Sequence, residues 1–212
     1  MTEPLERTLP SERLRWLMLA IQRETGSYGL PLLLRQAGLD RYVGRLPAAD
    51  RRPAVLPEEY ARLVQAVRAY YGLGARGTLT RIGREIFRQE RRSRPAEALL
   101  NRFTLILLPR ARRRIHILRS VAVGMAMPGQ GVSVGEDEQG LWLSDRTGDR
   151  TLGISSDEPC CWTAVGEIAE ALLWAAGLEP RVHEVSCRAA GAEECRFLIR
   201  WGLSKLSGEG PT

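Results

Sequence analysis

Four residues in the last quarter of the chain, Cys161, Glu184, Cys187 and Cys195, have side chains that could bind a metal ion. Thiolates and carboxylates are zinc ligands, and four of them can close a tetrahedral site with Zn–S distances of about 2.3 Å and Zn–O distances of about 2.0–2.2 Å. The spacing does not follow a standard zinc-finger pattern, so buried, reduced cysteines without a metal remain the alternative. The adjacent Cys160 would be a spare thiol or an alternative ligand.

A helix and a hairpin would have to bring these residues together. Apolar residues at helical spacing over 161–177 predict a helix with Cys161 at its N-terminus, where the helix dipole favours a thiolate. Two segments with strand-like alternation, 181–187 and 194–201, predict a hairpin that carries the other three candidate ligands. A bound metal would therefore join the helix to the hairpin.

The first arm of that hairpin cannot be a regular strand throughout. Glu184 and Cys187 are three residues apart, and side chains at that spacing point to opposite faces of a regular strand. The proposed site therefore requires a bend or a bulge near Val185 or Ser186.

The rest of the chain divides into a helical part and a mixed part. Apolar residues at helical spacing, interrupted by glycine and proline, predict four or five helices in the first 120 residues. After residue 128, alternating apolar residues predict strands near 132–134, 141–143 and 151–155, and antiparallel hairpins are the simplest arrangement. The segment 72–77 has the glycine spacing of a dinucleotide-binding loop, but it follows a helical segment and predicts a turn between helices.

Charge is distributed unevenly along the chain. Residues 1–120 hold 24 basic and 11 acidic side chains, whereas 121–212 hold 7 and 14. The basic half could attract nucleic acid, or it could face the acidic half within the molecule or across a dimer. Because the arginine-rich stretch 81–119 lacks a zinc finger or an RNA-stacking signature, we expect pairing within the protein or the dimer and no nucleic-acid partner.

No targeting or catalytic signal is evident. The N-terminus lacks the apolar core of a signal peptide, and the longest weakly polar run, 121–128, is too short to cross a bilayer. We therefore expect a cytoplasmic protein without a membrane span, in which the thiols are reduced. The absence of a catalytic or redox-cofactor motif favours a binding protein over an enzyme.

The segment from Pro159 to Ile199 resembles a known family. Its most specific part is Glu-Val-Ser-Cys-Arg-Ala-Ala-Gly-Ala-Glu-Glu-Cys-Arg-Phe at 184–197, which resembles the 4-vinyl reductase domain, a small ligand-binding module. Residues 76–87 are similar, more weakly, to the helical region that precedes this domain. The resemblance implies a dimeric α+β fold shared with TRAPP vesicle-tethering subunits and phenol-sensing activators. In that fold, N-terminal helices pack with a twisted antiparallel sheet, and a C-terminal helix and β-hairpin follow.

The resemblance also implies a metal. In the phenol-sensing relatives three cysteines and a glutamate hold a structural zinc, and Cys161, Glu184, Cys187 and Cys195 match that pattern residue by residue. Zinc with four protein ligands has no open coordination position, so its implied role is structural and no catalytic residue is assigned.

A ligand pocket is the next implication. The relatives bind an apolar ligand between the sheet and the helices, and phenol sensors orient the ligand hydroxyl with a histidine and a tryptophan. His116 and Trp142 are the comparable pair here, and Phe103 and Met125 belong to the apolar stretch around them. Packing in the core is the alternative role for these residues.

The resemblance finally implies an organisation and a function. We expect one compact unit with a mainly helical region for packing and dimerisation (1–120), an α+β ligand and zinc lobe of the 4-vinyl reductase type (121–203) and a flexible tail (204–212). The expected function is binding or sensing of a small apolar or aromatic molecule, such as a hydrocarbon, by a homodimer that signals to a separate signalling or biosynthetic partner. The alternatives are an accessory or reductase in (bacterio)chlorophyll 4-vinyl reduction and an assembly or tethering subunit.

Overall fold

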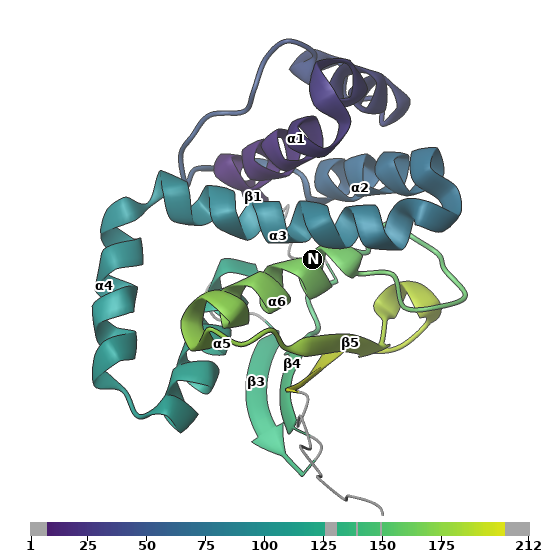
Figure 1. The fold of residues 1–212 in the computed structure, drawn as a ribbon. Helices are drawn as coiled ribbons and strands as arrows, with labels where there is room; N and C mark the ends of the chain where they lie inside the picture. Colours follow the sequence, from purple (N-terminus) through teal and green to yellow (C-terminus); the bar gives the residue numbers. More distant parts are fainter. Residues whose placement is uncertain (1–7, 126–130, 139, 149, 202–212) are drawn as a thin grey trace, which may run out of the picture.

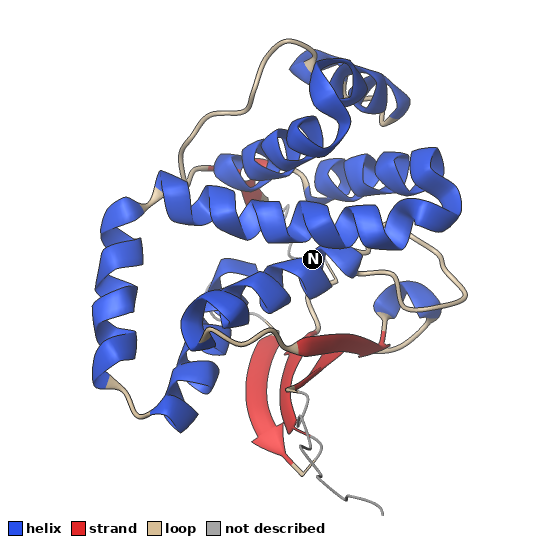
Figure 2. Ribbon diagram, viewed as in Figure 1, coloured by secondary structure: helices blue, strands red, loops and turns tan. Residues whose placement is uncertain are grey.

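The computed structural model describes residues 8–125, 131–138, 140–148 and 150–201. Six helices lie in these ranges: α1 (Ser11–Gln36), α2 (Pro57–Tyr71), α3 (Ala75–Ser93), α4 (Pro95–Leu107), α5 (Arg110–Met125) and α6 (Trp162–Ala176). The strands are β1 (Leu9–Pro10), β2 (Pro53–Val55), β3 (Val132–Asp137), β4 (Gly140–Asp145), β5 (Arg181–Ser186) and β6 (Cys195–Arg200). The predicted α+β class is confirmed (Figure 2). The predicted tail, 204–212, lies outside the described residues.

The main sheet is antiparallel and has the strand order β3-β4-β6-β5. The predicted C-terminal hairpin is confirmed, with Glu184 of β5 opposite Phe197 of β6. The pairing register shifts between Glu184 and Ser186, so the predicted irregularity near Val185 is present. This shift lets β5 direct Glu184 toward the same place as the residue that follows the strand, Cys187.

The predicted strand at 151–155 is wrong. The segment forms turns, in which the amide and the hydroxyl of Thr151 both donate hydrogen bonds to the carbonyl oxygen of Gly148. Gly148 and Gly153 have φ values of 70° and 68°, in the left-handed region that glycine tolerates best. The local hydrogen bonds and the two glycines therefore favour a loop over an extended strand.

Two apolar clusters make up the core. The first contains buried residues of α1, α2 and α3, and the second joins α5 and α6 to the main sheet. Helix α3 runs between the two (Figure 1): Ile82 and Ile86 belong to the first cluster and Phe87 to the second. Packing thus divides within α3, and α5 packs with the sheet lobe, although the predicted boundary was residue 120.

Helices α3 and α6 approach each other through glycine. A Cβ on Gly83 of α3 would lie 2.0 Å from the carbonyl oxygen of Thr163, and a Cβ on Gly166 of α6 would lie 2.0 Å from that of Thr80. Any side chain at either position would force the two backbones apart. This close contact fixes α6, and with it Cys161 at the helix N-terminus.

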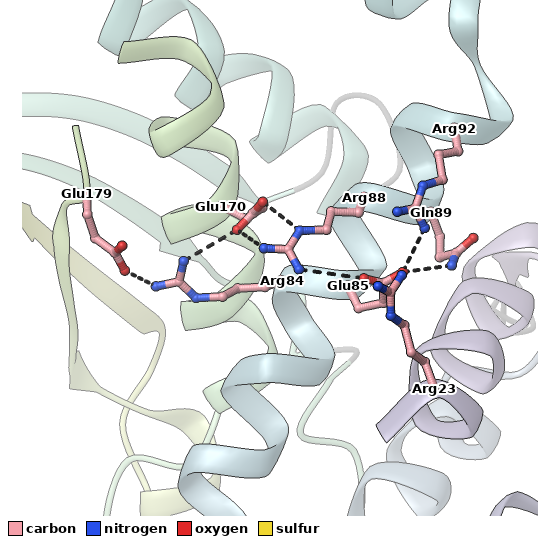
Figure 3. A network of polar contacts seen from close by, with 8 residues as sticks. All are labelled: Arg23, Arg84, Glu85, Arg88, Gln89, Arg92, Glu170 and Glu179. Carbon is pink, nitrogen blue, oxygen red and sulfur yellow. Dashed lines mark hydrogen bonds and ion pairs between the residues drawn. The ribbon is translucent and has the colours of Figure 1, made fainter. Parts of the chain in front are cut away.

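Ion pairs connect the basic and acidic halves of the chain on the same two helices. Arg88 of α3 contacts both carboxylate oxygens of Glu170 of α6, at 2.7 and 3.0 Å, and Arg84 reaches Glu170 and Glu179 (Figure 3). Part of the excess arginine is thus neutralised within one molecule, as the charge division predicted.

Helix α4 differs from the other helices in its exposure. It links α3 to α5 along one side of the molecule (Figure 1), and only its Leu105 is buried. Five large apolar side chains are exposed on it: Leu99, Leu100, Phe103, Ile106 and Leu107. Within the described ranges, none of the helices combines the length and apolar character needed to cross a membrane.

Candidate metal centre and neighbouring sites

The structure brings the four predicted metal ligands together. The candidate ligand atoms of Cys161, Glu184, Cys187 and Cys195 all lie within 4.8 Å of one another, and the three thiols are buried. The Sγ atom of Cys161 is 3.8 Å from that of Cys187 and 3.6 Å from that of Cys195. Three thiolates at about 2.3 Å from a tetrahedral zinc ion would be ~3.8 Å apart, so the sulfur positions fit this geometry.

Glu184 presents one oxygen to the cluster. Its Oε2 accepts a hydrogen bond of 2.7 Å from the backbone N–H of Cys161, which holds the carboxylate in place. Its Oε1 is buried and has no hydrogen-bond partner in the described part of the chain. Because a buried acceptor without a partner is costly, this oxygen is a suitable fourth ligand.

The electrostatics of the cluster favour a cation. Burial raises the pKa of Glu184 to about 8, and hydrogen bonding with Cys160 and then with Cys187 raises the pKa of Cys161 well above that of a free thiol. Four acidic groups this close repel one another when ionised. A divalent cation among them removes that repulsion and favours the deprotonated, metal-binding form.

Cys160 lies beside this group and not in it. Its Sγ is 4.0 Å from that of Cys187, and Cys160 is not part of the set whose ligand atoms lie within 4.8 Å of one another. The four ligands come from the N-cap of α6 (Cys161), from β5 (Glu184), from the connection after β5 (Cys187) and from β6 (Cys195).

The structure does not bring the predicted ligand contacts together. Trp142 alternates with Leu141 and Leu143, which face the second core, so it lies on the opposite face of the sheet. There its ring covers Gly135 and lies 4.8 Å from the guanidinium of Arg196.

The other three predicted ligand contacts lie on helices. His116 is half-buried on α5, on the helical side of the sheet, so it cannot share one ligand hydroxyl with Trp142 in this structure. Phe103 is exposed on α4. Met125 ends α5, and its side chain lies outside the described part of the structure.

A cavity that the sequence did not predict lies between α4, α5 and α6. Its volume is about 230 Å³, and its walls are Arg102, Leu105, Ile106, Arg113, Trp174 and Ala175. The available signal was Arg102, a cation inside the apolar stretch of α4.

A buried ion cluster also escaped the sequence analysis. Glu167 of α6 accepts hydrogen bonds from Arg13 of α1 at 3.2 Å and from Arg150 at 2.9 and 3.0 Å. The side chains of the three residues are only 8%, 5% and 9% exposed for Arg13, Glu167 and Arg150, respectively. The available signal was an acidic residue on the apolar face of a helix.

Comparison with known proteins supports the domain and the fold. Residues 152–201, which include all four candidate metal ligands, match the family model of the 4-vinyl reductase domain, so the predicted resemblance is confirmed and this segment is a domain of that family. No curated protein matches the sequence.

Solved structures of similar fold include three H-NOX proteins. One from S. oneidensis in the Fe(II)NO ligation state is 13% identical, with a TM-score of 0.59 over 92% of this chain and 99% of that chain. An Fe(II) unliganded protein from K. algicida is 12% identical (TM-score 0.58, 92% and 97%). The IWP-051-bound protein from Shewanella woodyi in the Fe(II)CO ligation state is 13% identical (TM-score 0.55, 95% and 99%). At this identity the likeness shows a shared fold alone.

Proposed function

We propose that this protein binds a small molecule and that a structural zinc ion holds its 4-vinyl reductase domain together. The observation that carries the proposal is the cluster of three thiols and one carboxylate around a single point. Bound zinc would cross-link the N-terminus of α6 to both arms of the hairpin. Because the protein fills all four positions, the ion supplies stability and offers no position for substrate.

Zinc content tests the metal. Protein purified without a metal-affinity tag should contain about one equivalent of zinc per chain, measured by mass spectrometry of the element. Cys187→Ser should reduce the content to below about half an equivalent. Cys160→Ser is the matched control, since it removes a buried neighbouring thiol, and it should keep the metal. Equal zinc content in Cys187→Ser and the unaltered protein would contradict the assignment.

Three observations support the small-molecule role. The 4-vinyl reductase domain resembles a ligand-binding module, and the solved structures of similar fold include proteins described with bound NO, CO or IWP-051. In this chain, a cavity with apolar and cationic walls lies between three helices. Such concave sites with a few polar groups are typical of small-molecule binding.

The same cavity does not fit a heme group. One structure of similar fold concerns heme redox potential and porphyrin distortion. A cavity of about 230 Å³ is below the usual range of about 300–1,000 Å³ for drug-sized ligands and cannot enclose a porphyrin. His116, the candidate donor on α5, does not line it. We therefore derive no chemistry from heme.

Mass spectrometry tests the small-molecule role. Native spectra of the purified protein should show a mass excess beyond zinc, and denaturation should release an organic compound. A chain with zinc alone, together with no binding in a calorimetric screen of small aromatic compounds, would overturn the role. Turnover of a vinyl-substituted tetrapyrrole with a reduced nicotinamide would favour the reductase alternative. A stable hetero-oligomer would favour the assembly alternative.

We also propose that two copies associate through α4. The exposed Leu99, Leu100, Phe103 and Leu107 form an apolar surface of the kind that marks protein contacts. A second copy would present the same residues, so one two-fold contact could cover both helices. Light scattering should give twice the chain mass, and Leu100→Glu should give a folded monomer. A monomeric unaltered protein would contradict this proposal.

A further inference from the structure

The cavity between α4, α5 and α6 is apolar over most of its wall. Leu105, Ile106, Trp174 and Ala175 contribute aliphatic and aromatic surface. An apolar cavity of about 150 Å³ can hold benzene. The present volume of about 230 Å³ therefore accommodates one ring, or a short aliphatic chain, together with a small polar group.

The two remaining wall residues are cations. Arg113 donates hydrogen bonds to the carbonyl oxygens of Leu108, at 2.9 Å, and Ile106, at 3.1 Å. These contacts use two of the five N–H donors of a guanidinium and fix its position. Across the described ranges, neither Arg113 nor Arg102 has an acidic partner within ion-pair distance. The wall thus carries two positive charges that the described residues leave without a carboxylate.

A third arginine lies behind the wall. The guanidinium of Arg91 is 4.2 Å from the ring of Trp174, in a cation–π contact that holds the ring in place. Its Nε and Nη2 atoms are buried and have no hydrogen-bond acceptor among the residues that the structure describes. Arg91 therefore adds positive charge to the region without using it in a hydrogen bond.

The backbone contributes to the same potential. Helix α5 begins at Arg110 and carries no acidic residue in its first turn, although the N-terminus of a helix favours negative charge. Instead its sequence opens with Arg-Ala-Arg-Arg-Arg at 110–114. The positive end of the helix and the arginines at its start are left to be stabilised by an external anion.

From this arrangement we propose that the cavity binds a small amphipathic carboxylate, with its ring or chain against Leu105, Trp174 and Ala175 and its carboxylate between Arg102 and Arg113. The planar fork of a guanidinium matches the two oxygens of a carboxylate. The inference rests on the proposed small-molecule role and names the chemical class of the ligand. It differs from the expectation of a neutral apolar or phenolic ligand beside His116 and Trp142.

A pair of probes of the same shape tests the charge. Isothermal titration calorimetry would compare 3-phenylpropionate with 3-phenylpropan-1-ol on the zinc-loaded, full-length protein. Because hydrogen bonds to charged groups are stronger than neutral ones, the carboxylate should bind at least about tenfold more tightly. Higher salt should weaken the binding of the carboxylate and leave that of the alcohol unchanged.

Four variants locate the site. Arg102→Gln changes an exposed side chain and should weaken carboxylate binding about tenfold with no effect on the alcohol. Arg113→Gln should act in the same direction, with thermal unfolding monitored because Arg113 also binds the end of α4. Ala175→Phe should fill the cavity and abolish binding of both probes. The matched control is Arg119→Gln, an exposed position on α5 outside the cavity wall, which should bind like the unaltered protein.

The outcomes separate this inference from the function on which it rests. Equal affinities for the two probes, both lost in Ala175→Phe, would overturn the carboxylate class and keep a small-molecule site. Binding unaffected by Ala175→Phe, or no binding of either probe, would overturn the cavity assignment. The broader small-molecule role would then depend on whether an organic compound is released from the purified protein.

Discussion

Helix α6 carries two buried acidic sites that differ in how their charge is neutralised. Glu167 is enclosed by the guanidinium groups of Arg13 and Arg150, so the protein supplies its own counter-ions. At the N-terminus of the same helix, Cys161 meets two further thiols and a carboxylate with no basic side chain among their hydrogen-bond partners in the described ranges. The first site is complete as folded, whereas the second requires a cation.

The cavity between α4, α5 and α6 is the opposite case. It gathers arginines without carboxylates, so the missing charge is negative. Buried charges are stable only when they are paired or bound to a metal. The comparison teaches that the residue types surrounding each site, and not its depth in the molecule, indicate whether an external ligand is needed and of which sign.

Metal removal should give the largest effect on stability. Binding of structural zinc contributes to the free energy of folding, so the metal-free protein should unfold at least about 10 °C below the zinc-loaded form. Thermal unfolding followed by circular dichroism, with and without a chelator, measures the difference. Cys187→Ser should reproduce the effect of the chelator. If it unfolds at the same temperature as the control Cys160→Ser, the cluster stabilises the fold without a metal.

Breaking the complete site should cost less. Glu167→Gln leaves Arg13 and Arg150 buried without a carboxylate, and removal of one partner from a buried ion pair costs about 3–5 kcal/mol. Urea unfolding at pH 7 measures this loss, and the variant should keep its full zinc content. Glu158→Gln changes an exposed carboxylate and should be nearly neutral. A zinc loss in Glu167→Gln as large as in Cys187→Ser would show that the two sites are not independent.

Acid should reduce the difference between the unaltered protein and Glu167→Gln. Burial acts to raise the pKa of Glu167, but Arg150 and Arg13 outweigh it and hold that pKa below its usual value. A lowered pKa stabilises the folded state above the pKa of the unfolded chain, about 4.3, and this contribution is lost as pH falls through the folded value. Urea midpoints between pH 7 and pH 3 should therefore converge below about pH 4.3. A constant difference over that range would contradict the prediction.

Sequence patterns identified the metal site better than the ion cluster. The hairpin, its irregularity near Val185 and the position of Cys161 at a helix start follow from period-2 and period-3.6 spacing, because these are local properties. Glu167 pairs with Arg13, which is 154 residues away, and with Arg150, which lies in the turn region beside the strand wrongly predicted at 151–155. Partners so far apart in sequence are set by helix packing, which single-sequence periodicity does not encode.

The ligand contacts failed for a related reason. The types of His116 and Trp142 suggested a pair, but the alternation of Leu141, Trp142 and Leu143 along β4 already implied that the ring faces away from the core. Applying strand periodicity to Trp142 would have separated the two residues. The cavity beside α4 could not be found in this way, because its walls come from three helices whose relative positions depend on the tertiary fold.

The smallest effect is expected where arginine meets carboxylate in contact with water. Arg88 binds Glu170 through two hydrogen bonds, but its side chain is 44% exposed (Figure 3). Solvent screening reduces the worth of such pairs to about 0.3–1 kcal/mol, so Arg88→Gln should lower the free energy of unfolding by no more than that. Raising sodium chloride from about 0.05 to about 0.5 M should remove most of the loss, because the Debye length then falls to a few ångströms. The loss in Glu167→Gln should persist at the same salt, since water and ions do not reach that cluster. If both losses respond equally to salt, burial does not distinguish the two kinds of pair.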